Sequence, residues 1–352
     1  MRILRHKKSK NISLLLSFCF VFLASCGGSS GGSSDNSSSN TTPAVPTPTS
    51  IQGVLDQAVS SGIDGIFVYI DQTNQVDESY AAGIENKLTQ QAANAESLFK
   101  IASISKLFIA VSAAKLAVKE QISINDTLAS WLPELADRVE NSDIITISHL
   151  IQHRSGIADF DSQAGFDWQN AHTDIDSTLL FALDKPSDFQ PNSRYEYSNT
   201  NYLLLAKILD RALGYSHHVF ISENILIPLG MHDTYAQLGD IDSARLAKGY
   251  WGGIERSTQD YVIPGGSMIS TVKDIALFIR ALNTGSLLTP EERELYGTVY
   301  WFNHSGWLPG YQSVANYESS IDAVVIQFIN TTGGSSESIA NSTYQNLINQ
   351  LN

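Results

Sequence analysis

The chain has 352 residues, enough for one large domain or two smaller ones, and 22 Lys and Arg against 36 Asp and Glu give it a formal net charge of −14. So acidic a chain is not expected to bind nucleic acid or to dock on an anionic lipid surface. Both cysteines, Cys19 and Cys26, lie near the N-terminus. The rest of the chain therefore has no disulfide and must be stabilised by its core alone.

Residues 1–26 are predicted to be a secretory signal that is not part of the fold. Basic residues precede an apolar run, Ile12–Leu23, which is short for a transmembrane helix, the alternative interpretation. The ending Leu23-Ala24-Ser25-Cys26 resembles the lipobox of bacterial lipoproteins. This resemblance implies cleavage before Cys26 and a lipid anchor on that cysteine. It also implies export to the cell envelope, and Gly27 favours the outer membrane.

Residues 27–50 are almost entirely Gly, Ser, Asn, Thr and Pro, which predicts a flexible tether. The folded domain is expected to occupy residues 51–352. A helix is expected at 51–60, where apolar residues recur at helical spacing. Two strands are expected at 65–70 and 79–83, joined by a polar turn.

The next helix is predicted from Ser103 to about Val118 and is apolar almost all the way round, so we expect it to be buried on every side. Its first turn contains Ser103 and Lys106, three residues apart and on one face. A lysine at the start of a buried helix is costly unless something uses it. The alternative is that Ser103 caps the helix and Lys106 extends to solvent.

The remaining elements are expected in the order helices, strands, helix. Mainly helical structure is predicted over about 120–265, with helices at 126–131, 147–152, 177–183, 202–213 and 218–225. A helix at 272–282, begun by Ser270 or Thr271, is followed by strands at 298–302, 312–316 and 323–328 and by a helix at 339–351. This order predicts an α+β fold, in which an antiparallel sheet is flanked by the first and last helices and a mainly helical lobe is formed by about 120–265.

Two further stretches carry side chains suited to catalysis. One is Tyr195-Glu196-Tyr197-Ser198-Asn199, and the other is His304-Ser305-Gly306-Trp307, beside a predicted strand. Taken singly, each has a structural explanation. Tyr197 could pack in the core, Asn199 could be a turn residue or helix cap, and His304 could be a histidine at a strand edge.

Together, Ser103-x-x-Lys106, Tyr197-x-Asn199 and His304-x-Gly306 resemble the serine beta-lactamase and penicillin-binding-protein superfamily. The branch most similar to this chain is the class C beta-lactamase-related group, which includes DD-carboxypeptidases, D-amino-acid peptidases and esterases. The resemblance runs from about Ile51 to Asn330. It includes the connecting segments Leu150–Gly156, Pro228–Met231, Ala247–Tyr250 and Gly265–Thr271.

The resemblance implies a beta-lactamase/transpeptidase-like fold and three catalytic residues. Ser103 would attack a carbonyl and form an acyl-enzyme, which divides one hard step into two easier ones. Lys106, one turn away, would accept the serine proton if burial lowers its pKa. Tyr197 would share that proton, pass it to the leaving group and then help to activate water.

The resemblance also implies how substrate is held. Asn199 would hydrogen-bond a substrate amide. His304 would stand where many relatives carry lysine, supporting Tyr197 and the polar end of the substrate, and Gly306 would also contact the bound substrate. The oxyanion hole would consist of the backbone N–H groups of Ser103 and Trp307.

Two departures from the family pattern weaken the case for an efficient beta-lactamase. His304 offers less fixed positive charge to a substrate carboxylate than lysine, and Trp307 puts a large ring where a small residue is usual. The sequence therefore predicts a serine hydrolase of amides or esters, with a D-amino-acid-containing peptide of peptidoglycan type as the first choice of substrate. A small-ester hydrolase and a penicillin-binding sensor or scaffold without turnover are the alternatives.

No metal ion or organic cofactor is expected. His149 and His153 have the four-residue spacing of a zinc pair on a helix. However, Leu150 stands where the metalloprotease motif requires Glu, and no further ligand cluster accompanies the pair.

Overall fold

The structure is a computed structural model that describes residues 48–352, and these form one compact unit. The predicted signal, the lipid site at Cys26 and all but the last three residues of the predicted tether lie outside the described residues and stay predictions. Within residues 48–352, no helix is both long enough and apolar enough to cross a membrane.

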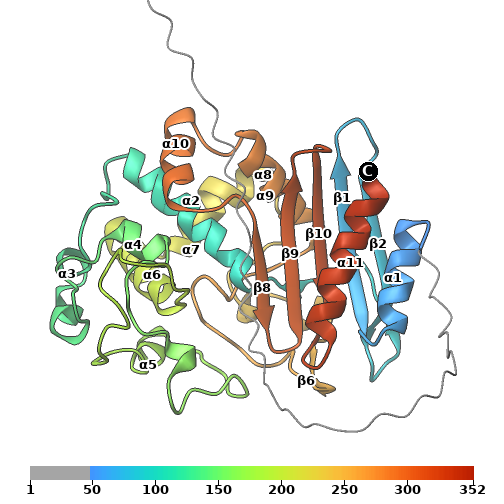
Figure 1. Ribbon diagram of the computed structural model, residues 1–352, viewed down its shortest axis with the longest axis horizontal. Coiled ribbons are helices and arrows are strands. Elements are labelled where there is room, and N and C mark those ends of the chain that lie inside the picture. Colours follow the sequence, from blue (N-terminus) through green and yellow to red (C-terminus); the bar gives the residue numbers. More distant parts are fainter. Residues whose placement is uncertain (1–47) are drawn as a thin grey trace, which may run out of the picture. The chain divides into compact units, whose positions relative to one another are not determined.

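A six-stranded antiparallel sheet with strand order β3-β2-β1-β10-β9-β8 forms one side of the molecule (Figure 1). Its strands are β1 (Gly65–Gln72), β2 (Glu78–Asn86), β3 (Gln91–Ala92), β8 (His304–Leu308), β9 (Tyr311–Glu318) and β10 (Ala323–Ile329). Strand β1 pairs with β10 from Ile66 opposite Ile329 to Gln72 opposite Ala323. The N-terminal and C-terminal strands thus lie side by side, and β8 is an edge strand.

Helices cover both faces of this sheet. On one face lie α1 (Ile51–Ser60) and α11 (Ser336–Leu351), against which Ile66 and Val68 of β1 pack (Figure 1). On the other face, Phe67 packs into the main core with α9 (Val272–Thr284). Successive residues of β1 therefore point to opposite layers, as the period of a strand requires. The predicted antiparallel sheet, flanked by the first and last helices, is confirmed.

The remaining elements stand beside the sheet. The helices are α2 (Ser105–Val118), α3 (Leu128–Trp131), α4 (Ile147–Ile151), α5 (Ile175–Leu179), α6 (Thr200–Leu213), α7 (His217–Ile221), α8 (Ile227–Leu229) and α10 (Pro290–Val299). Two small sheets pair β4 (Phe99–Lys100) with β7 (Ile269–Ser270), and β11 (Thr331–Thr332) with β5 (Tyr250–Trp251) and β6 (Ile254–Glu255). Helix α2 is enclosed as predicted, because all but three of its residues, Lys115, Ala117 and Val118, are buried.

Local sequence explains where α9 and α10 begin and end. The Thr271 hydroxyl accepts the N–H of Asp274 at 3.2 Å, which caps α9, and Gly285 ends that helix at φ +89°. The strand predicted at 298–302 is wrong. Thr289 and Glu292 form a capping box that starts α10, and the helix runs to Val299.

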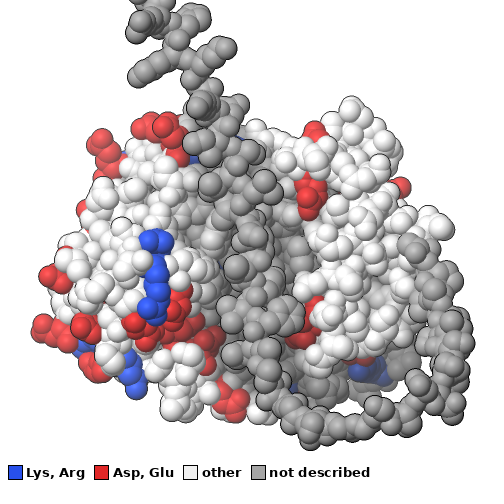
Figure 2. Space-filling model, in the orientation of Figure 1, with Lys and Arg blue, Asp and Glu red and all other residues white. Residues whose placement is uncertain are grey.

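The acidic surplus is spread unevenly over the surface. On the face shown in Figure 2, Asp and Glu side chains gather at the left and lower left, where the helical part of the chain lies in Figure 1. The sheet side of the same view carries few charged residues. The helical part therefore presents the more negative surface on this face.

Candidate active site

Ser103 lies in a short 3₁₀ turn, Ala102–Ile104, between β4 and α2. Ala102 has a φ of +52°, a left-handed conformation that residues with a side chain rarely adopt. The Ser105 hydroxyl donates to the Ala102 carbonyl at 2.7 Å and helps to hold the turn. The N-cap position of α2 is occupied by Ile104, so Ser103 is not its cap. A strained turn held in this way presents the Ser103 hydroxyl to other side chains.

Lys106 is fully buried, and its amine contacts three oxygens. The Nζ atom lies 3.1 Å from Ser103 Oγ, 2.8 Å from Asn199 Oδ1 and 2.9 Å from the Gly265 carbonyl. Burial lowers the pKa of Lys106 from its ordinary 10.5 to about 7, although Asp159 and Asp161 oppose the shift. The amine is therefore available as a base near neutral pH, and the alternative in which Lys106 extends to solvent is wrong.

Tyr197 reaches Ser103 from the other side. Its hydroxyl donates to Ser103 Oγ at 3.0 Å. Its ring stacks on that of His153 at a centroid distance of 4.2 Å, and His153 Nδ1 accepts the backbone N–H of Ser198 at 3.2 Å. Burial raises the pKa of Tyr197 well above its ordinary value. The phenol therefore keeps its proton at neutral pH, and Lys106 rather than a tyrosinate is the group able to accept the Ser103 proton.

Asn199 occupies the N-cap position of α6, but its side chain does not cap the helix. Instead the side chain accepts from Lys106, and Nδ2 donates to Asp161 Oδ2 at 3.2 Å. Asp159 Oδ1 accepts the backbone N–H of Asn199 at 2.9 Å. The loop that carries these two aspartates thus takes over part of the capping that the Asn199 side chain would otherwise provide.

His304 lies near the other predicted residues, but both of its ring nitrogens have other partners. The Nδ1 atom bonds the Ser305 carbonyl and must carry the proton, so Nε2 accepts from the Tyr300 hydroxyl at 2.9 Å. The His304 and Tyr197 rings are 6.5 Å apart. Burial, with Lys106 nearby, lowers the pKa of His304 to about 4. The ring is therefore neutral at pH 7 and offers no permanent positive charge.

Gly306 allows β8 to lie directly against the turn that carries Ser103. A Cβ at this position would lie 2.5 Å from the Ile101 carbonyl oxygen, 2.5 Å from Ser313 Oγ and 2.9 Å from Ala102 Cβ. These distances are far below van der Waals contact, so any side chain would push the strand away from the turn. Glycine is thus required sterically at this point.

Substituting Gly306 by alanine is expected to lower kcat at least about 10-fold, because the displaced strand moves the backbone of Trp307 away from Ser103. Steady-state kinetics and thermal unfolding measured on the same preparation check this. Gly239→Ala is the matched control, since a methyl there meets nothing within 4 Å and φ lies outside the left-handed region. Equal kcat for Gly306→Ala and the control would contradict the steric argument.

Trp307 lies in the edge strand β8, where its backbone N–H can face the open edge of the sheet. The hairpin pairs Leu308 with Tyr311 across a two-residue loop and Trp307 with Gln312 next to them. Pairs alternate along an antiparallel ladder, and the pair beside a two-residue loop is the hydrogen-bonded one. The backbone N–H of Trp307 therefore points away from β9. The indole is partly exposed and donates to Glu337 Oε1 at 3.1 Å.

Several residues that contact the predicted ones are not indicated by the sequence motifs, namely His153, Asp159, Asp161, Gly265 and Tyr300. Two of these, His153 and Gly265, lie in segments that already resembled the family, and that resemblance was the available signal. His149 and His153, the pair with zinc-like spacing, make separate contacts. His149 Nδ1 accepts the Thr146 N–H at 3.2 Å, whereas His153 packs on Tyr197.

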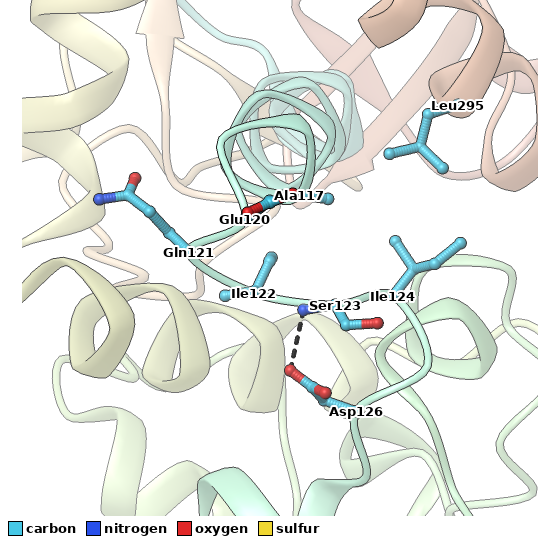
Figure 3. A pocket seen from close by; sticks show the side chains of 8 residues that line it. All are labelled: Ala117, Glu120, Gln121, Ile122, Ser123, Ile124, Asp126 and Leu295. Atoms are coloured by element: carbon cyan, nitrogen blue, oxygen red, sulfur yellow. Dashed lines mark hydrogen bonds between the residues drawn. The ribbon is translucent and has the colours of Figure 1, made fainter.

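A pocket of about 500 Å³ lies at the opposite end of α2 from Ser103 (Figure 3). Its lining includes Glu120, Asp126 and Leu295. The Ser123 N–H donates to Asp126 Oδ2 at 2.8 Å, which closes the turn after α2. None of the predicted catalytic residues lines this pocket.

Known proteins that are similar to this chain include members of the family that the three motifs resemble. The family model described as Beta-lactamase matches residues 51–299, and so includes the first two motifs but ends before His304. Penicillin-binding protein 4* of Bacillus subtilis (strain 168) is 32% identical over 174 residues, 48% of this chain and 37% of that protein. Esterase EstB of Burkholderia gladioli is 24% identical over 198 residues, 52% of this chain and 50% of that protein. The matches thus span half or less of these curated relatives.

The fold has a counterpart among solved structures. The D-amino acid amidase from Ochrobactrum anthropi SV3, complexed with L-phenylalanine amide, has a TM-score of 0.76 at 23% identity over 86% of this chain and 97% of that one. At this identity the likeness shows the fold, which is the beta-lactamase/transpeptidase-like fold predicted. Because the family model covers more than half of the chain, the resemblance inferred from the motifs is confirmed. The chain belongs to the Beta-lactamase family.

Proposed function

We propose that the protein hydrolyses an amide or ester through an acyl-enzyme on Ser103. One observation carries the proposal. Ser103 Oγ lies 3.1 Å from the buried Lys106 amine and 3.0 Å from the Tyr197 hydroxyl. Nucleophilic catalysis requires a nucleophile and a base within hydrogen-bond reach of each other, and here a further proton donor lies beside them.

In the acylation step, Ser103 Oγ attacks the carbonyl carbon while its proton passes to the neutral amine of Lys106. The negative charge on the carbonyl oxygen is stabilised by the backbone N–H groups of Ser103 and Trp307, and one such donor is worth about 10²–10³ in kcat. Tyr197 gives its proton to the leaving nitrogen or oxygen and is reprotonated from Lys106. Collapse of the intermediate breaks the bond to the leaving group.

Deacylation reverses these proton transfers with water as nucleophile. Water gives a proton to Lys106, directly or through Tyr197, as its oxygen attacks the acyl carbonyl. The bond from Ser103 Oγ to the carbonyl carbon breaks, and Ser103 recovers its proton. No metal ion or organic cofactor is needed for either half of the cycle.

The proposed substrate is a D-amino-acid-containing peptide or amide of the kind found in peptidoglycan. Support comes from the family and from the named penicillin-binding and D-amino acid amidase neighbours. The charges at the site favour substrates whose binding does not require a substrate carboxylate to pair with a positively charged protein group. His304 is neutral at pH 7, and Asp159 and Asp161, which lie beside Asn199, add negative charge once they ionise, in the case of Asp159 as the pH rises through about 7.

A small-ester hydrolase is the second candidate. The neutral His304 and the large Trp307 ring favour it over a beta-lactamase, and EstB gives a named precedent in the family. An ester also places less demand on protonation of the leaving group than an amide.

The test compares three substrates on the purified chain, with Ser103→Ala as the blank. The substrates are a fluorescent penicillin, a chromogenic ester and a pair of D- and L-amino acid amides. Turnover of the D-amide above the L-amide supports the first proposal, and turnover of ester alone supports the second. A stable penicillin adduct without turnover would indicate a sensor, and the absence of every Ser103-dependent reaction would overturn the proposed hydrolase.

A further inference from the structure

Two carboxylates outside all three motifs converge on the Asn199 side chain. Asp159 Oδ2 and Asp161 Oδ2 lie 3.4 Å and 3.2 Å from Asn199 Nδ2. Asp159 Oδ1 also accepts the backbone N–H groups of Asn199 and Thr200, at 2.9 Å and 3.4 Å. The loop between α4 and α5 is thereby tied to the first turn of α6, directly beside the lysine that acts on Ser103.

These two carboxylates fix the orientation of the Asn199 side-chain amide. With Nδ2 toward the two aspartates, Oδ1 faces Lys106 Nζ at 2.8 Å. The flipped amide would place its oxygen against two acidic oxygens and its NH₂ group against the lysine amine. At mildly basic pH, where both aspartates are ionised and can only accept hydrogen bonds, the flip would therefore exchange attraction for repulsion.

The orientation of this amide determines what the lysine can do. A neutral amine has two N–H donors and one lone pair. Asn199 Oδ1 and the Gly265 carbonyl, at 2.8 Å and 2.9 Å, accept both donors, which leaves the lone pair directed at Ser103 Oγ, 3.1 Å away. A flipped Asn199 would instead donate to that lone pair and remove the base from Ser103.

We propose that Asp159 and Asp161 are positioning residues that lock the Asn199 amide, so that the free lone pair of Lys106 is kept for Ser103. This inference rests on the proposed acyl-enzyme function. It assigns the aspartates no contact with the reacting atoms, because they act through Asn199.

The charges of Asp159 and Asp161 also affect the pKa of Lys106, which gives a second, independent way to detect their action. The titratable groups that face Lys106 are Asp159, Asp161, His153, His304, Tyr197 and Tyr202. Burial raises the pKa of Asp159 to about 7 and also raises that of Asp161, so both aspartates are ionised at mildly basic pH. The other four groups are neutral there, because burial lowers the pKa of both histidines and raises that of both tyrosines. Removing an aspartate charge is therefore expected to lower the pKa of Lys106 further.

The test uses Asp161→Asn in the full chain, because Asp161 is the less buried of the two aspartates and its amide isostere fills the same space. Acylation by a chromogenic ester should slow about 10- to 100-fold, since a misdirected base loses its alignment. The acid limb of kcat/KM should move to lower pH, and ¹⁵N NMR of Lys106 Nζ should show its pKa lowered. Asp137→Asn, an exposed aspartate, controls for loss of one negative charge, and Asp161→Glu should restore acylation.

A double-mutant cycle separates positioning from a merely structural role. If Asp161 acts through Asn199, Asp161→Asn should add almost nothing in an Asn199→Ala background. An undiminished effect in that background, or an unchanged Lys106 pKa in Asp161→Asn, would overturn the proposal. Failure of the proposed function shows differently, as a wild-type chain without Ser103-dependent hydrolysis, and the Lys106 titration can still be read in that case.

Discussion

Replacing Ser103 by alanine is expected to lower kcat/KM for any hydrolysed substrate by about 10⁴-fold or more, because no other group in the site can form the acyl intermediate. The Lys106 amine and the Tyr197 hydroxyl both point at the missing oxygen. Neither can replace it, since the amine is held by Asn199 and Gly265 and the phenol keeps its proton. Burst kinetics with a chromogenic ester measure the loss directly.

Ser112→Ala is the matched control for that substitution. Ser112 is buried in α2, the helix that follows the Ser103 turn, and its hydroxyl bonds only the Phe108 carbonyl among the described residues, at 2.8 Å. Losing this bond should cost about 1 kcal/mol of the free energy of unfolding and leave kcat within about twofold. If Ser103→Ala and Ser112→Ala behave alike, Ser103 is not the nucleophile.

Sequence predicts the architecture well where periodic patterns are unambiguous. The helix at 51–60 has the predicted bounds, and the strands around Gln312 and Ala323 are found with small extensions. The strand predicted at 298–302 failed for a physical reason. Val299 and Tyr300 have strand-forming side chains, but Val299 is the last residue of a helix fixed by its own N-terminal capping box. The capping box was present in the sequence, and it outweighed the β-strand propensity of Val299 and Tyr300.

The candidate catalytic residues Ser103, Lys106 and Tyr197 could be proposed from the sequence, because each stands in a short motif that resembles the family. Asp159 and Asp161 could not, since their importance depends on a loop that lies beside Asn199 only in the folded chain. His304 shows the same limit. Its place near Tyr197 was predicted, but the Tyr300 hydroxyl that binds its ring belongs to a segment interpreted as a strand.

Substituting Lys106 by methionine should abolish acylation with little loss of stability. A methionine keeps the volume of the buried side chain and removes the base, so kcat should fall by about 10³–10⁴-fold. Wild-type activity should also rise with pH through about 7, where burial places the pKa of Lys106. Methionine should remove both the activity and this pH dependence.

The lowered pKa of Lys106 also determines how stability changes in Lys106→Met. Lys106 titrates near 10.5 when unfolded and near 7 when folded, so burial costs about 4–5 kcal/mol below pH 7. This cost falls as pH rises from 7 and vanishes above 10.5. Methionine avoids the cost but leaves Asn199 Oδ1 and the Gly265 carbonyl without their donor, at about 1–3 kcal/mol each. The two effects nearly cancel at pH 7.

Wild type should therefore gain stability over Lys106→Met by up to about 4 kcal/mol between pH 7 and pH 10, measured by urea unfolding at each pH. Lys119→Met, at the exposed C-terminal end of the same helix, should keep full activity. A stability difference that stays constant across this pH range would mean that the amine is already charged when folded. The base would then have to be another group, and Tyr197 would be the remaining candidate.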